Sequence, residues 1–292
     1  MKKVLTIVGL FIGINATAQI ATSGTTNSGT NASAIGYQSS ATNTVSTAIG
    51  RETLASGVTS TAMGYQTSAT NTASTAMGNS STASGVTSTA IGNNSTASGE
   101  TSIAMGFETE ATDNASIAMG YQTTSTGGAS TAMGFITTAS GFGSTSIGYK
   151  TTASGNSSTA IGKNTIASDF GSLVIGQYNL SGSTVTNSAT EPNYANTAFV
   201  IGNGTASNAK SDAFKVMVNG NTTVGNDLTV SGDIVVSSDV RLKANIISLG
   251  STLAKLLLID GKRYTMKNEG KQKIGVLAQD IQKVFPELVT TD

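Results

Sequence analysis

Near the C-terminal end, Ser238 precedes Lys243 by five positions, a spacing that does not by itself indicate a reaction. The chain has no His and no Cys. A Ser-His-Asp or Cys-His system and a zinc site built from such ligands are therefore excluded. Neutral lysine remains as the base for a serine nucleophile, provided that burial or nearby positive charge lowers its pKa from about 10.4. Arg241 could lower the pKa of Lys243 in this way, or pair with Asp239. The other interpretation of this cluster, from Ser238 to Lys243, is a solvated turn with ordinary surface charges.

The segment that must position this pair differs in composition from the rest of the chain. Nine of the 16 basic residues lie between Arg241 and Lys283. Apolar runs and alternation predict a small α+β unit with a helix at 249–259, a strand at 262–267, a buried strand at 274–277 and a helix at 278–285 ended by Pro286.

Two strings in this segment carry a resemblance. Residues 238–246 read Ser-Asp-Val-Arg-Leu-Lys-Ala-Asn-Ile, and 274–280 read Ile-Gly-Val-Leu-Ala-Gln-Asp, followed by Phe-Pro-Glu-Leu-Val. They resemble the intramolecular chaperone auto-processing domain of tail fibres and endosialidases, the peptidase S74 family. The resemblance implies that the domain trimerises, helps upstream β-structure to fold, and cuts itself off with Ser238 as nucleophile and Lys243 as base. The family's domain continues beyond this block, so we expect a truncated domain here.

Most of the chain is a repeat with a period of 14 residues. Ile or Met stands immediately before the repeated glycine, and Ala stands five residues after it in nearly every copy. Such a fixed period is the signature of a repeat architecture. The glycines of the period are Gly36, Gly50, Gly64, Gly78, Gly92, Gly106, Gly120, Gly134, Gly148, Gly162 and Gly176.

A second column predicts a turn inside each repeat. Seven residues after the repeated glycine comes Gly, Asn or Asp, as in Gly57, Asn71 and Asp113. These residue types tolerate positive φ, so we expect a positive-φ turn there that splits each repeat into two short arms. Asp113 and Asp169 are assigned to this turn and not to calcium, which needs six or more oxygen ligands. We expect no metal and no cofactor.

The arms alternate with the period of a strand. Ser60, Ala62 and Gly64 share one face, and Thr61 and Met63 share the other. We expect the face that carries only Ser, Ala and Gly to line the inside of a narrow coil. The outer face carries one Ile or Met per coil, and we expect the aromatic residues two positions further on to share it. They are Tyr37, Tyr65, Phe107, Tyr121, Phe135 and Tyr149.

A strand spacing of about 4.8 Å gives a rod of roughly 50 Å. An apolar stripe along its whole length predicts an interface. We therefore expect parallel copies to associate around an axis. The aromatic column has two interpretations: contact with carbohydrate or matrix, or burial beside the Ile/Met stripe at subunit contacts, which we favour. The repeat resembles the head of YadA-like trimeric bacterial adhesins. That resemblance implies a mainly β fold, a left-handed parallel β-roll assembled as a homotrimer.

The N-terminus has the layout of a secretory signal peptide at 1–18. Lys2 and Lys3 precede an apolar run at 4–14, and Ala-Thr-Ala ends at Ala18. Eleven apolar residues are too few for the ~20 that span a bilayer. We expect a secreted or bacterial cell-surface protein without a transmembrane anchor in this chain.

The resulting domain limits are 1–18 for the signal peptide, 19–180 for the repeats, 181–237 for a loop and β-rich neck, and 238–292 for the chaperone segment. Within the neck, we expect a degenerate last coil at 198–202, a strand pair at 213–218 and 222–224, and short strands at 228–236.

The leading functional hypothesis is an exported trimeric, adhesin-like fibre with a possible host-surface, glycan or matrix receptor, folded by a removable C-terminal chaperone. The alternatives are a self-cleaving endopeptidase, whose single turnover is its main activity, and a phage or prophage tail fibre. The repeats offer no paired carboxylates of the glycosidase type. Nucleic acid is not an expected partner, because Arg51, Lys150 and Lys163 are the basic residues of the repeats.

Overall fold

The structure is a computed structural model that describes residues 23–231, 244–248, 250, 252–265 and 272–289. The chain divides into two compact units between Leu228 and Thr229. The predicted signal peptide at 1–18 lies outside the described residues.

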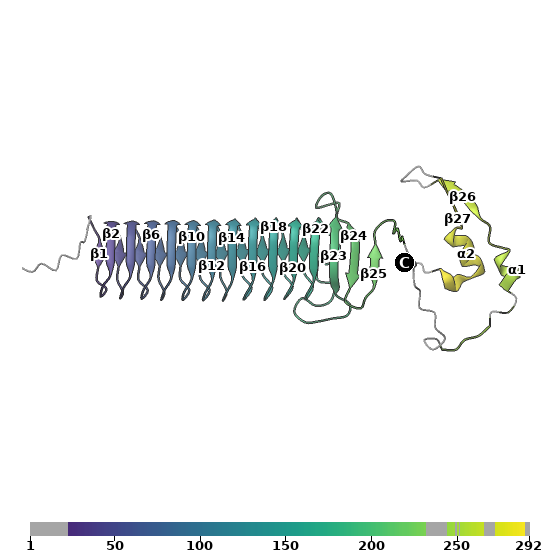
Figure 1. Ribbon diagram of the computed structural model, residues 1–292, viewed down its shortest axis with the longest axis horizontal. Coiled ribbons are helices and arrows are strands. Elements are labelled where there is room, and N and C mark those ends of the chain that lie inside the picture. The colour runs from purple at the N-terminus through teal and green to yellow at the C-terminus, as the bar shows by residue number, and fades with distance from the viewer. Residues whose placement is uncertain (1–22, 232–243, 249, 251, 266–271, 290–292) are drawn as a thin grey trace, which may run out of the picture. The chain divides into compact units, whose positions relative to one another are not determined.

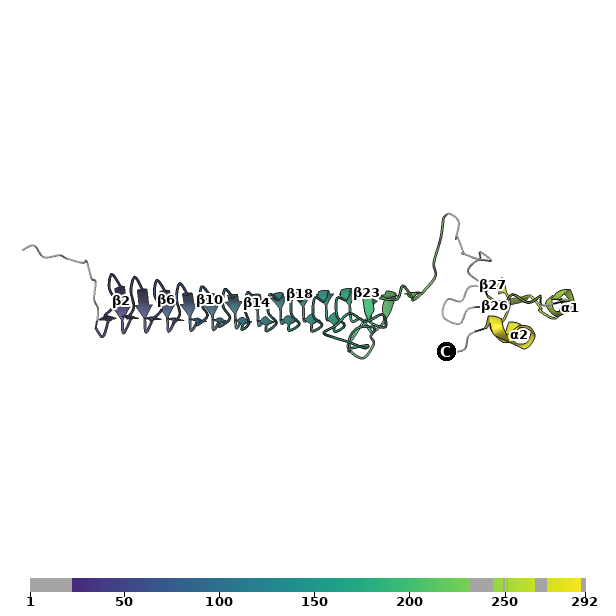
Figure 2. The same ribbon diagram turned by 90° about the horizontal axis from the view of Figure 1, so that it is seen from below.

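The first unit is a parallel β-solenoid whose coils stack in a straight row (Figures 1 and 2). Each coil contributes one five-residue strand to one sheet and one two-residue strand to a second sheet. The long strands are β2 Ser33–Tyr37, β4 Thr47–Arg51, β6 Thr61–Tyr65, β8 Thr75–Asn79, β10 Thr89–Asn93, β12 Ile103–Phe107, β14 Ile117–Tyr121, β16 Thr131–Phe135, β18 Thr145–Tyr149, β20 Thr159–Lys163 and β22 Leu173–Gln177.

The second sheet of the solenoid has 11 short strands. From β1 to β22 both sheets are parallel, and each strand residue pairs with its equivalent one repeat on, as Ala62 does with Ala76. The predicted β-roll with a 14-residue period is thus confirmed. The short strands are β1 Thr26–Asn27, β3 Ser40–Ala41, β5 Leu54–Ala55, β7 Ser68–Ala69, β9 Thr82–Ala83, β11 Thr96–Ala97, β13 Glu110–Ala111, β15 Thr124–Ser125, β17 Thr138–Ala139, β19 Thr152–Ala153 and β21 Ile166–Ala167.

The interior of the solenoid is filled by small side chains, as the alternation predicts. Ala62 on a long strand and Ala69 on a short strand are both 0% exposed, and their equivalents form two continuous buried columns. Where Ser146 replaces alanine, its hydroxyl lies 2.8 Å from the Thr151 hydroxyl, so the buried polar group is paired. The core is therefore narrow and tolerates only small residues.

The turns differ from the sequence-based expectation. The Gly/Asn/Asp column does not adopt positive φ. Each coil instead has left-handed residues at two other places. One lies two positions after the Gly/Asn/Asp column, with φ of 56° at Val45 and 55° at Thr59. The other lies two positions after the repeated glycine, with φ of 56° at Glu52. This conformation directs the backbone N–H of Glu52 to the carbonyl of Tyr37 in the preceding coil, at 2.8 Å. These bonds between coils offset the roughly 1–2 kcal/mol cost of a left-handed residue.

The Gly/Asn/Asp column still begins a turn, which a serine completes. The Ser60 hydroxyl donates to the carbonyl of Gly57 at 2.7 Å, and the Ser60 amide donates to the same oxygen at 3.3 Å. Where the column holds Asn71, its amide group donates to Ser84 of the next coil at 3.0 Å. The serine four residues before the repeated glycine, from Ser46 through Ser172, is thus a turn residue.

The repeated glycines are required by close contact between coils. Gly92 has φ +134°, and a Cβ there would lie 1.9 Å from the carbonyl oxygen of Gly106 in the next coil. Both the backbone conformation and the space therefore demand glycine.

The expected last coil at 198–202 is confirmed. It belongs to β23, Thr197–Asn203, which pairs in parallel with β22. Val200 lies under Val174, and both are 0% exposed. The predicted hairpin at 213–224 is present as β24, Asp212–Met217, and β25, Thr222–Val224. The described residues 228–230 form no strand, contrary to prediction, and 232–236 lie outside the described residues.

The second unit contains α1, Thr252–Leu256, β26, Lys262–Thr265, β27, Gln272–Gly275, α2, Ala278–Val284, and the 3-10 turn η2, Pro286–Leu288. The two strands pair antiparallel. The expected α+β content is present. The strand predicted to be buried is instead exposed, since Ile274 is 76% exposed. In this single chain no described element covers that face.

Candidate functional site

The predicted catalytic pair, Ser238 and Lys243, lies outside the described residues, as do Asp239 and Arg241. Their geometry is not described, and the Ser–Lys dyad stays a prediction. The functional surfaces that the structure describes are on the solenoid.

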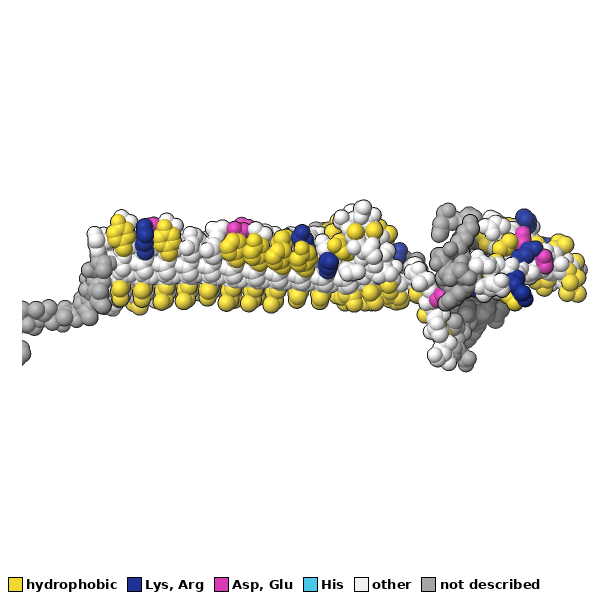
Figure 3. Space-filling model, turned by 90° about the horizontal axis from the view of Figure 1, so that it is seen from above, with side chains coloured by type: hydrophobic (Ala, Val, Ile, Leu, Met, Phe, Trp, Pro, Cys, Tyr) yellow, Lys and Arg dark blue, Asp and Glu magenta, His cyan; other side chains and the backbone are white. Residues whose placement is uncertain are grey.

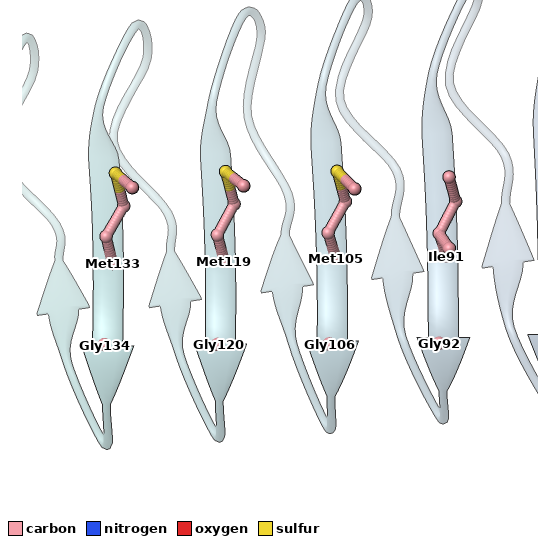
Figure 4. A pocket seen from close by; sticks show the side chains of 8 residues that line it. All are labelled: Ile91, Gly92, Met105, Gly106, Met119, Gly120, Met133 and Gly134. Carbon is pink, nitrogen blue, oxygen red and sulfur yellow. The ribbon is translucent and has the colours of Figure 1, made fainter.

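The first surface is the Ile/Met ladder, one apolar side chain per coil on the outer face of the long-strand sheet. Figure 4 shows Ile91, Met105, Met119 and Met133 projecting from successive strands in the same direction. With the glycines that follow them, they line a shallow groove of about 550 Å³. The full ladder is Ile35, Ile49, Met63, Met77, Ile91, Met105, Met119, Met133, Ile147, Ile161 and Ile175.

The ladder is only partly covered in the single chain. Met133 is 36% exposed and Ile161 is 40% exposed, whereas the alanines on the opposite face of the same strands are fully buried. Figure 3 shows the ladder as one continuous yellow row along the solenoid. A continuous apolar row of this length marks an interaction surface.

The second surface is the aromatic row, and it corrects an expectation. We expected these rings on the same face as the ladder, but Figure 3 shows two apolar rows separated by a white band of backbone and other side chains. The positive φ of the intervening glycine, +139° at Gly106 for example, turns the following residue away from the ladder. The rings of Phe107, Tyr121, Phe135 and Tyr149 stack on one another with centroids 4.9, 4.8 and 5.2 Å apart.

At the N-terminal end of the aromatic row a cation is placed between two rings. The Arg51 guanidinium lies 5.7 Å from the ring centroid of Tyr37 and 5.3 Å from that of Tyr65. Arg51 is also paired with Glu52 at 3.0 Å. Hydrogen bonds from Gln66 and from Arg51 hold the pKa of Glu52 below its usual value, so this carboxylate remains ionised beside the arginine.

The two turn aspartates have different environments. Asp113 accepts a hydrogen bond from the neighbouring Asn114 amide at 2.7 Å. Asp169 is 0% exposed, and its two oxygens accept from the backbone amides of Thr186 at 2.6 Å and Thr197 at 2.8 Å. Asp169 therefore fixes the loop between β22 and β23, a role that sequence reasoning missed. Among the described residues, no group of three or more acidic side chains is arranged to hold a metal ion.

In the described part of the C-terminal unit, most apolar side chains are exposed. Leu253, Leu257 and Leu258 are 69%, 78% and 71% exposed. Phe285, in contrast, is 5% exposed, with the Lys255 ammonium 5.5 Å from its ring centroid.

The fold and its surfaces define a fibrous β-solenoid protein. Five stretches, 28–53, 55–81, 83–109, 111–135 and 139–165, match the family profile of the YadA head domain repeat (2 copies). Residues 238–290 match Peptidase_S74, described as chaperone of endosialidase. The chain therefore carries YadA head repeats followed by an endosialidase chaperone segment, which makes it an adhesin- or tail-fibre-like protein. No curated protein matches the chain significantly.

Within the described residues, no helix is long and apolar enough to span a bilayer.

Proposed function

We propose that the protein is an exported, homotrimeric surface fibre whose C-terminal segment assists assembly. The Ile/Met ladder carries this proposal, because it is an uninterrupted apolar row with one Ile or Met in every coil of the rod. Three parallel copies with ladders facing a common axis bury every rung at equivalent positions. The family matches support a trimer and a surface or extracellular location.

Export is supported by the sequence at 1–18, with its paired lysines, apolar run and small-residue cleavage signal. Self-cleavage at Ser238 is supported by the match of 238–290 and by the presence of the serine and lysine that the family resemblance assigns to the reaction. In this proposal the chaperone aligns the three chains and then detaches.

The test of the trimer places charge in the ladder. Met105→Asp combined with Met119→Asp puts six carboxylates of a trimer at the shared axis, and burying an unpaired charge is strongly unfavourable. We expect sedimentation analysis to show trimers for the wild type and monomers or aggregates for this variant. The matched control is Asn79→Asp with Asn93→Asp, which adds the same charge at the ends of two long strands, on exposed side chains outside the ladder. Soluble trimers of the ladder variant would contradict the proposal.

A further inference from the structure

A pocket lies where the aromatic row meets the last coils of the solenoid. Lys163 on β20 stands at the aromatic position and pairs in register with Tyr149 on β18. One residue later in three successive coils come Lys150, Asn164 and Tyr178. These five residues line a hollow of about 440 Å³, which we call the lysine–tyrosine pocket. Figure 3 shows basic side chains directly beyond the last rings of the aromatic row.

Each ammonium group of the pocket lies near a tyrosine ring. The Nζ atom of Lys150 is 5.5 Å from the ring centroid of Tyr149, and that of Lys163 is 5.7 Å from the ring centroid of Tyr178. Because the two lysines stand on adjacent coils, about 4.8 Å apart along the rod, two positive charges share one hollow. Among the described residues, no carboxylate forms an ion pair with either lysine.

The cluster at the other end of the row provides the comparison. Arg51 lies between two tyrosine rings in the same manner, but Glu52 neutralises it at 3.0 Å. At the lysine–tyrosine pocket the residue corresponding to Glu52 is Lys150 itself, or Asn164 one coil later. The positive charge there is uncompensated, so the pocket favours an anion.

The rest of the lining indicates what carries the anion. Tyrosine rings offer apolar surface with a hydroxyl, and the Asn164 amide can donate to and accept from hydroxyl groups. The volume is in the range of small-ligand sites, about 300–1,000 Å³. A peptide could not add as a strand, because both edges of β20 are already paired with β18 and β22. A stacked nucleobase is disfavoured, because one face of Tyr149 is covered by Phe135 at 5.2 Å.

We propose that the lysine–tyrosine pocket binds an acidic sugar residue, with Lys150 and Lys163 on its carboxylate or sulfate ester and Asn164 on its hydroxyl groups. This inference rests on the proposed function of the solenoid as a binding fibre and names the class of ligand that it takes. Three equivalent pockets on a trimer would bind a polymeric glycan with a gain from multivalency.

The experiment measures binding of the full chain to immobilised oligosaccharides of equal length. Hyaluronan supplies carboxylates alone, keratan sulfate supplies sulfate esters alone, and a chitin oligosaccharide is uncharged. Oligoglutamate and single-stranded DNA serve as polyanions without sugar acids. We expect binding to at least one acidic saccharide, weaker binding at high salt, and none to the chitin oligosaccharide. The arm that binds distinguishes carboxylate from sulfate.

Variants locate the site. Lys150→Gln and Lys163→Gln should each weaken binding about tenfold, as expected for loss of one charge-assisted contact, and the double variant should lose it. Arg51→Gln is the matched control, since it removes a cation from the same row but leaves the pocket intact, and it should bind as the wild type does.

The outcomes separate this inference from the proposed fibre. Three results for a trimeric chain would contradict the proposed pocket but leave the proposed fibre standing. They are no binding to any acidic saccharide, equal binding to oligoglutamate or DNA, and unchanged binding by the double variant. A monomeric chain that binds acidic saccharide through Lys150 and Lys163 overturns the trimer and supports the pocket.

Discussion

Asp169 allows a sharp test of how the end of the solenoid is built. Its carboxylate is fully buried and accepts two backbone amides, from Thr186 at 2.6 Å and Thr197 at 2.8 Å. Asp169→Ala leaves both amides without this acceptor. Hydrogen bonds to charged groups contribute about 1.5–3 kcal/mol each, so the loop at 178–196 and the start of β23 should lose about 3–6 kcal/mol of local stability.

The assay is hydrogen exchange followed by mass spectrometry on peptides that cover 180–200, because repeat arrays need not unfold in a single step. A loss of about 3 kcal/mol accelerates exchange through local opening by about 100-fold. Asp113→Ala is the matched control at the equivalent position of the repeat. There the carboxylate bonds one exposed neighbouring amide, so the expected cost is below about 1 kcal/mol. Equal exchange of the loop in both variants would refute the assigned role of Asp169.

Two further predictions concern the interior and the dyad. Ala90→Leu should overpack the fully buried column and lower stability by roughly 1–3 kcal/mol or more, whereas Thr89→Leu on the outer face should be much milder; equal midpoints in thermal unfolding would mean that the faces are assigned wrongly. The full-length protein should break near Ser238, and both Ser238→Ala and Lys243→Arg should prevent this, since arginine cannot accept the proton. Intact-mass spectrometry on the wild type and both variants would detect the cleavage. Cleavage that persists in Ser238→Ala would contradict the peptidase role and leave only the fold resemblance.

The period and the column chemistry were sufficient to predict the solenoid. A 14-residue repeat with alternating small residues predicts which face is inside, and Ala62 and Ala90 are indeed fully buried. The same reasoning predicted the degenerate coil at 198–202 and the hairpin at 213–224. These elements are governed by local alternation and turn residues, which a sequence displays directly.

The errors arise where backbone conformation and tertiary contact decide. The positive-φ positions fall on residues such as Val45 and Thr59, because hydrogen bonds between coils, and not the residue's own preference, select that conformation. Ile274 is exposed although its apolar run predicted burial, because such a run does not show whether another element packs on it. The binding of Asp169 to amides 17 and 28 positions further on could not be inferred from its column, where aspartate looks like any other turn residue.

The separation of the two apolar rows follows from one backbone angle and has a functional consequence. If the repeated glycine had ordinary strand geometry, the residue after it would lie beside the Ile/Met ladder, and self-association would bury the rings as well. At φ values such as +130° at Gly134 the chain turns instead, and the next side chain joins a different edge. In the proposed trimer the ladder is restricted to Ile and Met by its place between copies, while the residue after the glycine varies among Tyr, Phe, Arg, Lys, Asn and Gln. A fibre built in this way can change what it contacts along one edge without changing how its copies assemble along the other.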